Sequence, residues 1–353
     1  MTNYLQDASG TSAFMPDPSK PAHLLRACPA YEETPVLEVM QPFGGTLLIK
    51  DETHRMNLGA FKALGGVYAV AQLIAMEWEK KSGKVLEPED FASDEIKAFA
   101  RDLTFVCASA GNHGMAVAAG ARIFGANARI HLAREMPDAF EKRLQNQAAN
   151  VIRSSQTYEE SVAAALQDAK TNDDILLADG SWPGYTIPPS LVMEGYTVIA
   201  EEMRRKFEAN KQWPSHVYLQ AGVGGLAAAI TFMIRSNWAV QPEITIVEPD
   251  AAPCLMASSK LGEPTTVDGP VSNMGRLDCK APSILAFDLL ERSSVKYMTI
   301  SDEEAEQAAA QLADAGVATT PSGAAGLAGQ IKALSSDRQD GYLPLIIVSE
   351  GAV

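Results

Sequence analysis

The chain has 353 residues, 46% of them hydrophobic and 21% charged, which is the composition of an ordinary globular protein. Its formal net charge of -15 argues against binding to nucleic acids or to anionic membrane surfaces, because both attract clustered Lys and Arg. The sequence has no recognisable signal peptide and no apolar run of membrane-spanning length, so we expect a cytoplasmic protein without a membrane partner.

The cysteines and histidines do not follow disulfide or metal-ligand patterns. Cys28, Cys107, Cys254 and Cys279 lack any Cys-x-x-Cys spacing, which argues against a disulfide framework and a zinc site. We expect Cys107 to be a buried thiol. Cys254 and Cys279 could face each other across a site, but the sequence gives little support for this. The five histidines show no ligand spacing either, so we expect no catalytic metal ion.

Short apolar runs alternate with Ala-rich helical stretches from about Thr46 onward. Residues 1–40 are rich in Pro and polar residues and predict an extended arm with little regular structure. The expected strands are residues 46–52, 104–109, 128–133, 150–155, 175–179, 216–222, 243–249 and 344–351. The expected helices include residues 63–76, 114–125, 195–209 and 227–234. This alternation predicts a doubly wound α/β fold with mostly parallel sheets, covered by helices on both faces.

The charged stretch 77–102 is a candidate seam between two lobes. A small, mobile lobe would then span residues 96–189. A larger lobe would combine residues 1–95 with residues 190–353.

The first motif runs from Asp51 to Gly66 and contains Lys62. It follows an apolar strand and leads into a helix, so we expect Lys62 in the first helical turn beside Phe61. The helix dipole and the mostly uncharged surroundings both disfavour an ammonium ion, so the pKa of Lys62 is expected to be lowered. A neutral amine is what Schiff-base chemistry requires. The alternative is an ordinary surface lysine at a helix start.

The second motif, residues 108–114, also lies between a strand and a helix. It contains Ser109, Ala110, Gly111, Asn112 and His113. Backbone N–H groups at such a helix start can bind an anion such as a carboxylate, and the Asn112 amide can donate a hydrogen bond to a ligand. We regard the other four residues as candidate substrate contacts. A helix end capped by Asn or Ser explains the same residues without a ligand.

The third motif, residues 220–227, is a glycine-rich turn between a strand and a helix. Consecutive N–H groups in such a turn can cradle a phosphate. The residues concerned are Gly222, Val223, Gly224, Gly225 and Leu226. A dinucleotide-binding fingerprint fits the same turn, with Glu248 at the end of the next strand as the ribose-binding acid. The turn alone does not separate these two sites from each other or from a simple tight turn.

The fourth motif, residues 346–352, is a buried strand that ends in a small hydroxyl residue, Ser349. A hydroxyl group at this position can exchange a hydrogen bond with a ring nitrogen of a ligand. A routine strand end is the alternative.

Together and in this order, the four motifs resemble those of the fold-type II pyridoxal-phosphate (PLP) enzymes, the group of tryptophan synthase β and threonine dehydratase. Within the group, the chain is most similar to the diaminopropionate ammonia-lyases, over about residues 25–352. The segments that carry this similarity are Pro29–Pro35, Lys50–Lys62, Asp179–Tyr185, Ile187–Pro188 and Gly195–Tyr196. The resemblance implies two doubly wound lobes with PLP between them, the larger lobe being the PLP-binding one.

The resemblance also implies a role for each matched residue. Lys62 would bind PLP covalently and would act as the acid and base at the substrate Cα, with Phe61 beside the cofactor. Asn112 would bond the 3′-oxygen of PLP, and residues 222–226 would hold its phosphate. Ser349 would face the pyridine nitrogen.

The implied reaction is α,β-elimination from a small β-substituted amino acid, such as 2,3-diaminopropionate, to a 2-oxo acid and ammonia. Asp179 matches an acid near the substrate and is the candidate proton donor to the leaving group. Because Ser349 is neutral, the pyridine nitrogen would stay largely unprotonated, which favours rapid loss of the β-group over transamination. We expect the enzyme to be a homodimer.

Two features depart from the lyase pattern. The lyases have Thr-Asp-Gly-Asn-His where this chain has residues 109–113, so Ala110 replaces a carboxylate that can serve the D-isomer. We therefore expect a preference for the L-isomer, and this form of the motif resembles the serine and threonine dehydratases. The chain also stops soon after the Ser349 motif, so this edge of the site is expected to differ from that of the family.

Three other functions remain open. A dehydratase acting on L-serine, L-threonine or 3-hydroxyaspartate would use the same fold and cofactor, as would an amino-acid racemase. A nicotinamide-dependent dehydrogenase is a remote alternative, because it leaves the Lys62 and Asn112 motifs unexplained.

Overall fold

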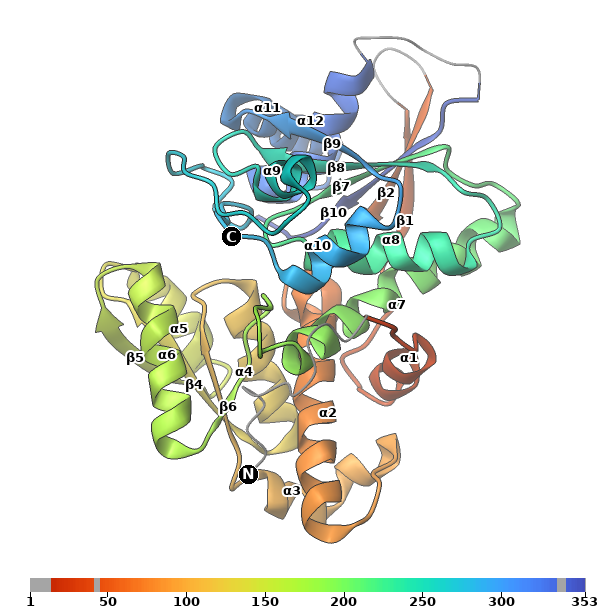
Figure 1. Ribbon diagram of the computed structural model, residues 1–353. Helices are drawn as coiled ribbons and strands as arrows, with labels where there is room; N and C mark the ends of the chain where they lie inside the picture. The colour runs from red at the N-terminus through yellow and green to blue at the C-terminus, as the bar shows by residue number, and fades with distance from the viewer. Residues whose placement is uncertain (1–13, 41–44, 335–340, 353) are drawn as a thin grey trace. The chain divides into compact units, whose positions relative to one another are not determined.

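The computed structural model describes residues 14–40, 45–334 and 341–352, which fall into two compact units (Figure 1). The first unit holds residues 16–31 and 62–195, and the second holds residues 32–61 together with the chain from Tyr196 onward. The sequence instead placed all of residues 1–95 and 190–353 in the larger lobe. The mobility of the smaller lobe stays a prediction.

The first unit is built on a parallel four-stranded sheet in the order β5-β4-β3-β6. Its strands are β3 (Thr104–Ala108), β4 (Asn127–Ala133), β5 (Asn150–Ser155) and β6 (Ile175–Leu176). Its helices are α1 (Ser19–Arg26), α2 (Lys62–Ser82), α3 (Asp94–Ala100), α4 (Asn112–Phe124), α5 (Asp138–Gln145) and α6 (Tyr158–Asn172). Helices α4, α5 and α6 connect successive strands, because parallel neighbours require crossover connections.

Small residues let α2 and α4 pack closely in the first unit. A Cβ atom on Gly66 would lie only 2.5 Å from the Cβ of Ala116. Gly66 lies one turn beyond Lys62, and Ala116 lies one turn beyond Asn112. The first turns of the two helices therefore lie at the same end of the helix pair.

The second unit contains a six-stranded sheet in the order β1-β2-β10-β7-β8-β9, in which only β1 runs antiparallel to its neighbour among the described strands. Its strands are β1 (Val36–Met40), β2 (Thr46–Asp51), β7 (His216–Gln220), β8 (Glu243–Pro249), β9 (Lys296–Ile300) and β10 (Pro344–Val348). Its helices are α8 (Gly225–Asn237), α9 (Cys254–Leu261), α10 (Ile284–Glu291), α11 (Asp302–Asp314) and α12 (Pro321–Leu334).

Helices cover both faces of this sheet, as Figure 1 shows. Apolar residues of α11 and α12 share a buried cluster with the sheet, including Leu312, Leu327, Ile346 and Val247. The long helix α7 (Ile187–Asn210) belongs to the first unit up to Gly195 and to the second unit from Tyr196. The predicted doubly wound α/β fold is therefore confirmed.

All eight predicted strands are present, but helix α1 and strands β1 and β9 were not predicted. The arm expected over residues 1–40 contains helix α1 and strand β1 in its described part. The edge strand β9 was also missed, because most of its residues are only half-buried and it lacks a long apolar run. Residues 77–102 form no simple linker: α2 continues to Ser82 and α3 occupies Asp94–Ala100.

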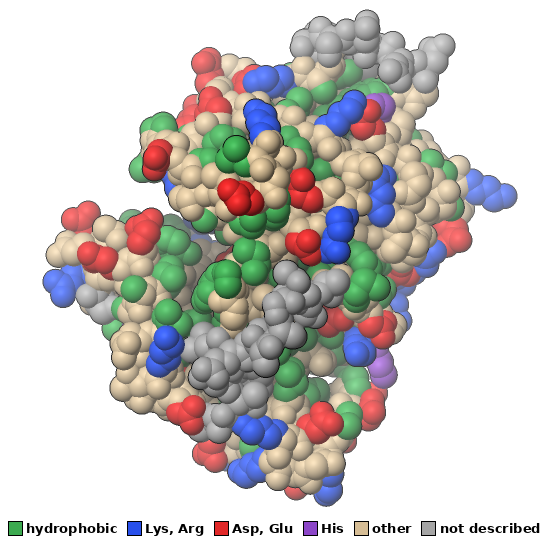
Figure 2. Space-filling model, in the orientation of Figure 1, with side chains coloured by type: hydrophobic (Ala, Val, Ile, Leu, Met, Phe, Trp, Pro, Cys, Tyr) green, Lys and Arg blue, Asp and Glu red, His purple; other side chains and the backbone are tan. Residues whose placement is uncertain are grey.

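No helix in the described part of the chain is long and apolar enough to cross a membrane. On the face shown in Figure 2, the coloured Lys and Arg side chains are interspersed with Asp and Glu. They do not gather into one basic patch on that face, which agrees with the overall acidic charge.

Candidate active site

The backbone that leads into Lys62 is fixed by the residues that follow β10. The N–H of Phe61 donates to the carbonyl of Ser349 at 3.1 Å, and the N–H of Gly351 donates to the carbonyl of Gly59 at 2.9 Å. These bonds extend the sheet of the second unit by a short antiparallel bridge. Lys62, the first residue of α2, follows this bridged backbone directly in the chain.

The Lys62 ammonium forms an ion pair with Asp179 within the first unit. Its Nζ lies 2.6 Å from Asp179 Oδ2, and the two side chains are 18% and 25% exposed. The sequence named both residues but did not indicate that they pair. Lys62 does lie at a helix N-terminus as predicted, but its surroundings are charged rather than neutral.

A buried tyrosine holds the segment that carries Asp179. The hydroxyl of Tyr185 donates to the carbonyl of Leu176 at 2.9 Å and accepts from the N–H of Ala178, also at 2.9 Å. The Tyr185 ring stacks on Trp182, with ring centroids 4.2 Å apart. This clamp fixes the chain just after β6 and explains why the segment 179–185 carries large aromatic residues.

The charge state of Asp179 follows from its neighbours. Burial raises its pKa, but the adjacent Lys62 ammonium, the nearby His113 and the hydrogen bonds it accepts outweigh this effect and hold the pKa below its usual range. Burial lowers the pKa of His113, whose Nε2 donates to the carbonyl of Leu177 at 2.8 Å. Asp179 is therefore a carboxylate whose counter-ion is Lys62.

The second motif forms the start of α4, as predicted. Gly111 is the residue before the helix, and the Asn112 and His113 side chains are buried. A Cβ atom on Gly114 would lie 2.1 Å from the carbonyl oxygen of Ser109, so only glycine fits there. Ala110 lies in this turn, half-buried, and its methyl group offers no proton acceptor.

The glycine-rich turn of the second unit has the features of a phosphate site. Gly224 has a φ of 99°, which glycine readily adopts, and α8 begins at the next residue. Among the described residues, no backbone N–H of residues 222–226 donates to a backbone carbonyl, whereas those of Ala221 and Ala228 do. Free N–H groups at a helix start bind phosphate oxygens, so the turn fits the phosphate of PLP.

The hydroxyl of Ser349 also fits the cofactor. The residue is 5% exposed and follows β10 directly. In the described part of the chain, its hydroxyl has no hydrogen-bond partner. The hydroxyl is therefore available to exchange a hydrogen bond with a ring nitrogen.

Glu248 does not have the ribose-binding role that the dinucleotide alternative required. Its two carboxylate oxygens accept the N–H groups of Leu255 and Met256, each at 2.8 Å, at the start of α9. The side chain is fully buried, and burial raises its pKa to about 7. A carboxylate enclosed in this way caps a helix and is closed to a ribose hydroxyl.

Cys254 and Cys279 both lie against the glycine-rich turn. The thiol of Cys254 lies 3.7 Å from the carbonyl of Gly222, and a Cβ atom on Gly222 would lie 2.9 Å from the Cys279 sulfur. Neither cysteine forms a disulfide bond. Cys107 is buried in β3, as predicted, and burial raises the pKa of its thiol.

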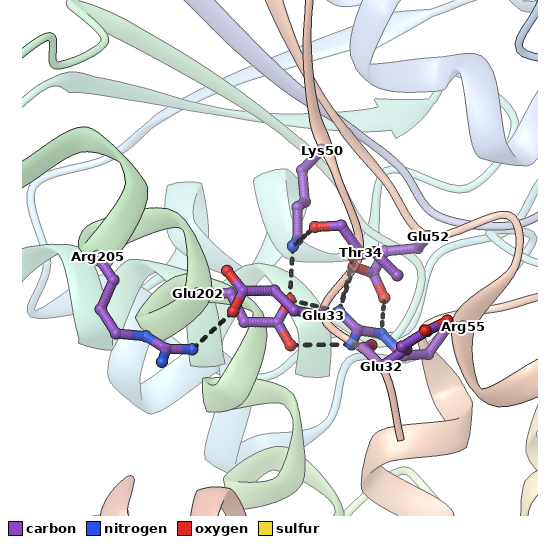
Figure 3. A network of polar contacts seen from close by, with 8 residues as sticks. All are labelled: Glu32, Glu33, Thr34, Lys50, Glu52, Arg55, Glu202 and Arg205. Carbon is purple, nitrogen blue, oxygen red and sulfur yellow. Dashed lines mark hydrogen bonds and ion pairs between the residues drawn. The ribbon is translucent and has the colours of Figure 1, made fainter. Parts of the chain in front are cut away.

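A buried network of charged residues in the second unit was not predicted. Lys50 Nζ lies 2.5 Å from Glu202, and Arg55 binds both Glu202 and Glu52 at 2.7 Å (Figure 3). Thr34 donates to Glu52 and accepts from Arg55. The charged side chains are fully buried. Lys50 and Glu52 belong to the segment that resembles the lyases, but no local signal indicates their partner on α7.

The chain belongs to the family of pyridoxal-phosphate dependent enzymes, whose family model matches residues 28–349. It is 31% identical over 262 residues to a diaminopropionate ammonia-lyase of Escherichia coli K12, covering 73% of this chain and 64% of the relative. A probable D-serine dehydratase of Vibrio cholerae is 26% identical over 310 residues, covering 82% of this chain and 68% of the relative.

A solved structure of diaminopropionate ammonia-lyase from Escherichia coli, in complex with an aminoacrylate-PLP azomethine reaction intermediate, superposes with a TM-score of 0.80. It is 25% identical, and the match covers 99% of this chain and 93% of that chain. The predicted family, fold type and PLP cofactor are confirmed. The chain spans 64% of the length of the Escherichia coli K12 relative. The predicted homodimer and cytoplasmic location stay predictions.

Proposed function

We propose that this chain is a PLP-dependent ammonia-lyase that eliminates the β-amino group of an L-2,3-diaminopropionate-like amino acid, giving a 2-oxo acid and ammonia. The observation that carries the proposal is the pairing of an ionised Asp179 with Lys62 at 2.6 Å. The diaminopropionate ammonia-lyases among the relatives support the same reaction.

The residues that match the family motifs would each have a role toward the cofactor. Lys62 would bind PLP covalently and Asn112 would bond its 3′-oxygen, while Phe61 lies next to Lys62 in the chain. The N–H groups of residues 222–226 would hold the phosphate, and Ser349 would bond the pyridine nitrogen. Bound PLP supplies an electron sink for negative charge at the substrate Cα.

Asp179 favours an ammonium leaving group. Because the carboxylate is ionised, it would accept rather than donate a proton, and we assign it an anchoring role in place of the donor role inferred from the sequence. A protonated β-amine leaves as neutral ammonia and needs no proton donor, whereas a hydroxyl group leaves as water only when it is protonated. The Lys62 ammonium occupies the place beside Asp179 that the β-ammonium of the substrate would take.

Lys62 and Ala110 favour the L-isomer. When Lys62 is released from the cofactor, its neutral amine would take the Cα proton from the face it occupies. The D-isomer presents its proton to the opposite face, where Ala110 cannot accept it.

A serine-type dehydratase is the second candidate, because the Ser109–His113 form of the motif and the Vibrio cholerae relative favour it. The two functions are separated by assaying 2-oxo acid release from both isomers of 2,3-diaminopropionate, L-serine, D-serine, L-threonine and 3-hydroxyaspartate. We expect the highest kcat/KM with L-2,3-diaminopropionate and no turnover by the Lys62→Ala control. Faster turnover of a hydroxy amino acid would contradict the proposal.

A further inference from the structure

Lys280 lies in the segment between α9 and α10, and three oxygen atoms hold its ammonium group. Its Nζ donates to the carbonyls of Ala251 at 2.9 Å and Pro270 at 2.8 Å, and to the carboxylate of Asp278 at 2.6 Å. An ammonium ion has three N–H donors, so all of them have a partner here. Carbonyl and carboxylate oxygens are the ligands that proteins use for hard cations, so the side chain occupies a ready-made cation site.

The chain is packed tightly around this ammonium. A Cβ atom on Gly269 would lie 2.0 Å from the carbonyl oxygen of Ala251 and 3.5 Å from Lys280 Nζ. The second carboxylate oxygen of Asp278 accepts the N–H of Ser272 at 3.2 Å. Lys280 therefore ties two parts of this segment, residues 269–270 and Asp278, to the turn after β8.

The segment tied by Lys280 forms a wall against the glycine-rich turn. A Cβ atom on Gly222 would lie 3.1 Å from Leu277 Cα and 2.9 Å from the sulfur of Cys279, the residue next to Lys280. The N–H of Ser283 donates to the carbonyl of Val223 at 2.9 Å. The segment therefore fixes both the position and one carbonyl of the turn assigned to the phosphate.

We propose that Lys280 is a positioning residue that acts as a built-in cation and keeps the phosphate-binding turn in shape. It touches no residue assigned to the cofactor, and its effect passes through Leu277, Cys279 and Ser283. This inference rests on the proposed phosphate site. The positive charge matters because its removal leaves two carbonyls and a carboxylate, only 13% exposed, without their shared donor.

The test measures phosphate binding without Schiff-base chemistry. The full chain is freed of PLP and titrated with pyridoxine 5′-phosphate, which has the phosphate and ring of PLP but no aldehyde. We expect Lys280→Ala to raise the dissociation constant on the order of tenfold, as removal of supporting residues does at other sites. The matched control is Lys296→Ala in the same unit, whose side chain is 65% exposed and pairs with Glu243 alone among the described ion pairs. This variant should bind as the wild type does.

Chemical rescue of the Lys280→Ala variant shows whether the positive charge of Lys280 or only its packing supports the turn. The atoms lost in Lys280→Ala correspond to n-propylammonium, and n-propanol has the same length without the charge. We expect n-propylammonium, and not n-propanol, to restore most of the lost affinity in the variant while leaving the wild type unchanged. Equal rescue by both compounds, or by neither, would overturn the cation role.

Two further outcomes are decisive. An unchanged dissociation constant in Lys280→Ala, with a wild type that binds, overturns the inference alone. A wild type that does not bind pyridoxine 5′-phosphate overturns the proposed cofactor site. If Lys280→Ala does not fold, Asp278→Asn takes its place, because it keeps the size of the side chain and removes its charge; we expect severalfold weaker binding, and wild-type affinity in this variant refutes the role.

Discussion

Two charged clusters in this molecule differ in what surrounds each charge. In the second unit, the side chains of Lys50, Arg55 and Glu202 are fully buried, and each carboxylate oxygen of Glu202 accepts a hydrogen bond from a basic neighbour (Figure 3). In the first unit, Lys62 and Asp179 form a pair that is partly exposed. The buried network is closed, whereas the exposed pair can exchange its cation for another.

This difference separates structural from chemical charges in one chain. A buried charge is expensive to leave without a partner, so the closed network must stay intact for the fold to persist. In the proposed function, the Lys62–Asp179 pair would be broken when Lys62 binds the cofactor, and Asp179 would then need a new cation. We expect mutations in the two clusters to act on different properties, stability in one and turnover in the other.

The largest effect on stability is expected for Glu202→Ala. The change leaves the buried charges of Lys50 and Arg55 without a shared partner and should lower the free energy of unfolding by about 3–5 kcal/mol. The matched control is Glu208→Ala on the same helix, whose side chain is 62% exposed beside Arg204, and it should cost less than about 1 kcal/mol. Urea unfolding of both variants measures this difference. An equal loss in the free energy of unfolding would contradict the structural role of the buried network.

Asp179→Asn should affect turnover and leave stability almost unchanged. The amide keeps the shape but cannot anchor an ammonium ion by charge, so kcat/KM for L-2,3-diaminopropionate should fall by roughly tenfold to a hundredfold, as expected for the loss of a hydrogen bond to a charged group. Any activity on L-serine should fall by a smaller factor, because its leaving group carries no charge. An equal loss of kcat/KM for both substrates would contradict the role proposed for the ionised Asp179 carboxylate.

Glu248 tests what happens to a buried carboxylate without a cation. Its pKa is raised to about 7 from 4.5, so ionisation is opposed in the folded state. The stability that this group contributes is present below about pH 4.5 and is lost as the pH rises to about 7, by at most about 3 kcal/mol. In Glu248→Gln this part of the pH dependence should vanish. The test is to measure the free energy of unfolding of both proteins at several pH values. If stability depends on pH in the same way in both, Glu248 does not have a raised pKa.

The smallest effect is expected at Ala110, where a carboxylate can be added to the chemical site. Ala110→Asp should raise the activity on D-2,3-diaminopropionate relative to the L-isomer by on the order of tenfold or more, because it supplies a proton acceptor on the opposite face. Initial rates with each isomer give the ratio. Comparable turnover of the two isomers by the unmodified enzyme would show that position 110 does not decide the stereochemistry.

Much of the fold could be predicted because its strands are continuous apolar runs. β8 occupies the predicted residues 243–249, and Lys62 and Asn112 begin helices as expected. The short helix α1 and the edge strands β1 and β9 were missed, since their burial is partial and depends on neighbours far along the chain.

The site was only partly predictable, for a related physical reason. Local sequence identified Lys62 and Asp179 separately, but the ion pair joins residues 117 positions apart. The local sequence predicts that Glu202 is an exposed charge on a polar helix, and only the tertiary structure buries it against Lys50. Lys280 gave no signal either, because two of its three partners are backbone carbonyls, which any sequence supplies.

The pairing of Phe61 with Ser349 has a consequence for how the protein folds. The residue before Lys62 is made early by the ribosome, whereas its hydrogen-bond partner is made much later. Strand β2, which leads to Lys62, likewise pairs with β10 rather than with an early neighbour on that side. Such distant pairings form slowly, because the entropy of closing the intervening chain must be overcome first. During synthesis, we expect the first unit to become compact before the Lys62 backbone is fixed, so a nascent chain should acquire its protease-resistant core earlier than its ability to retain PLP.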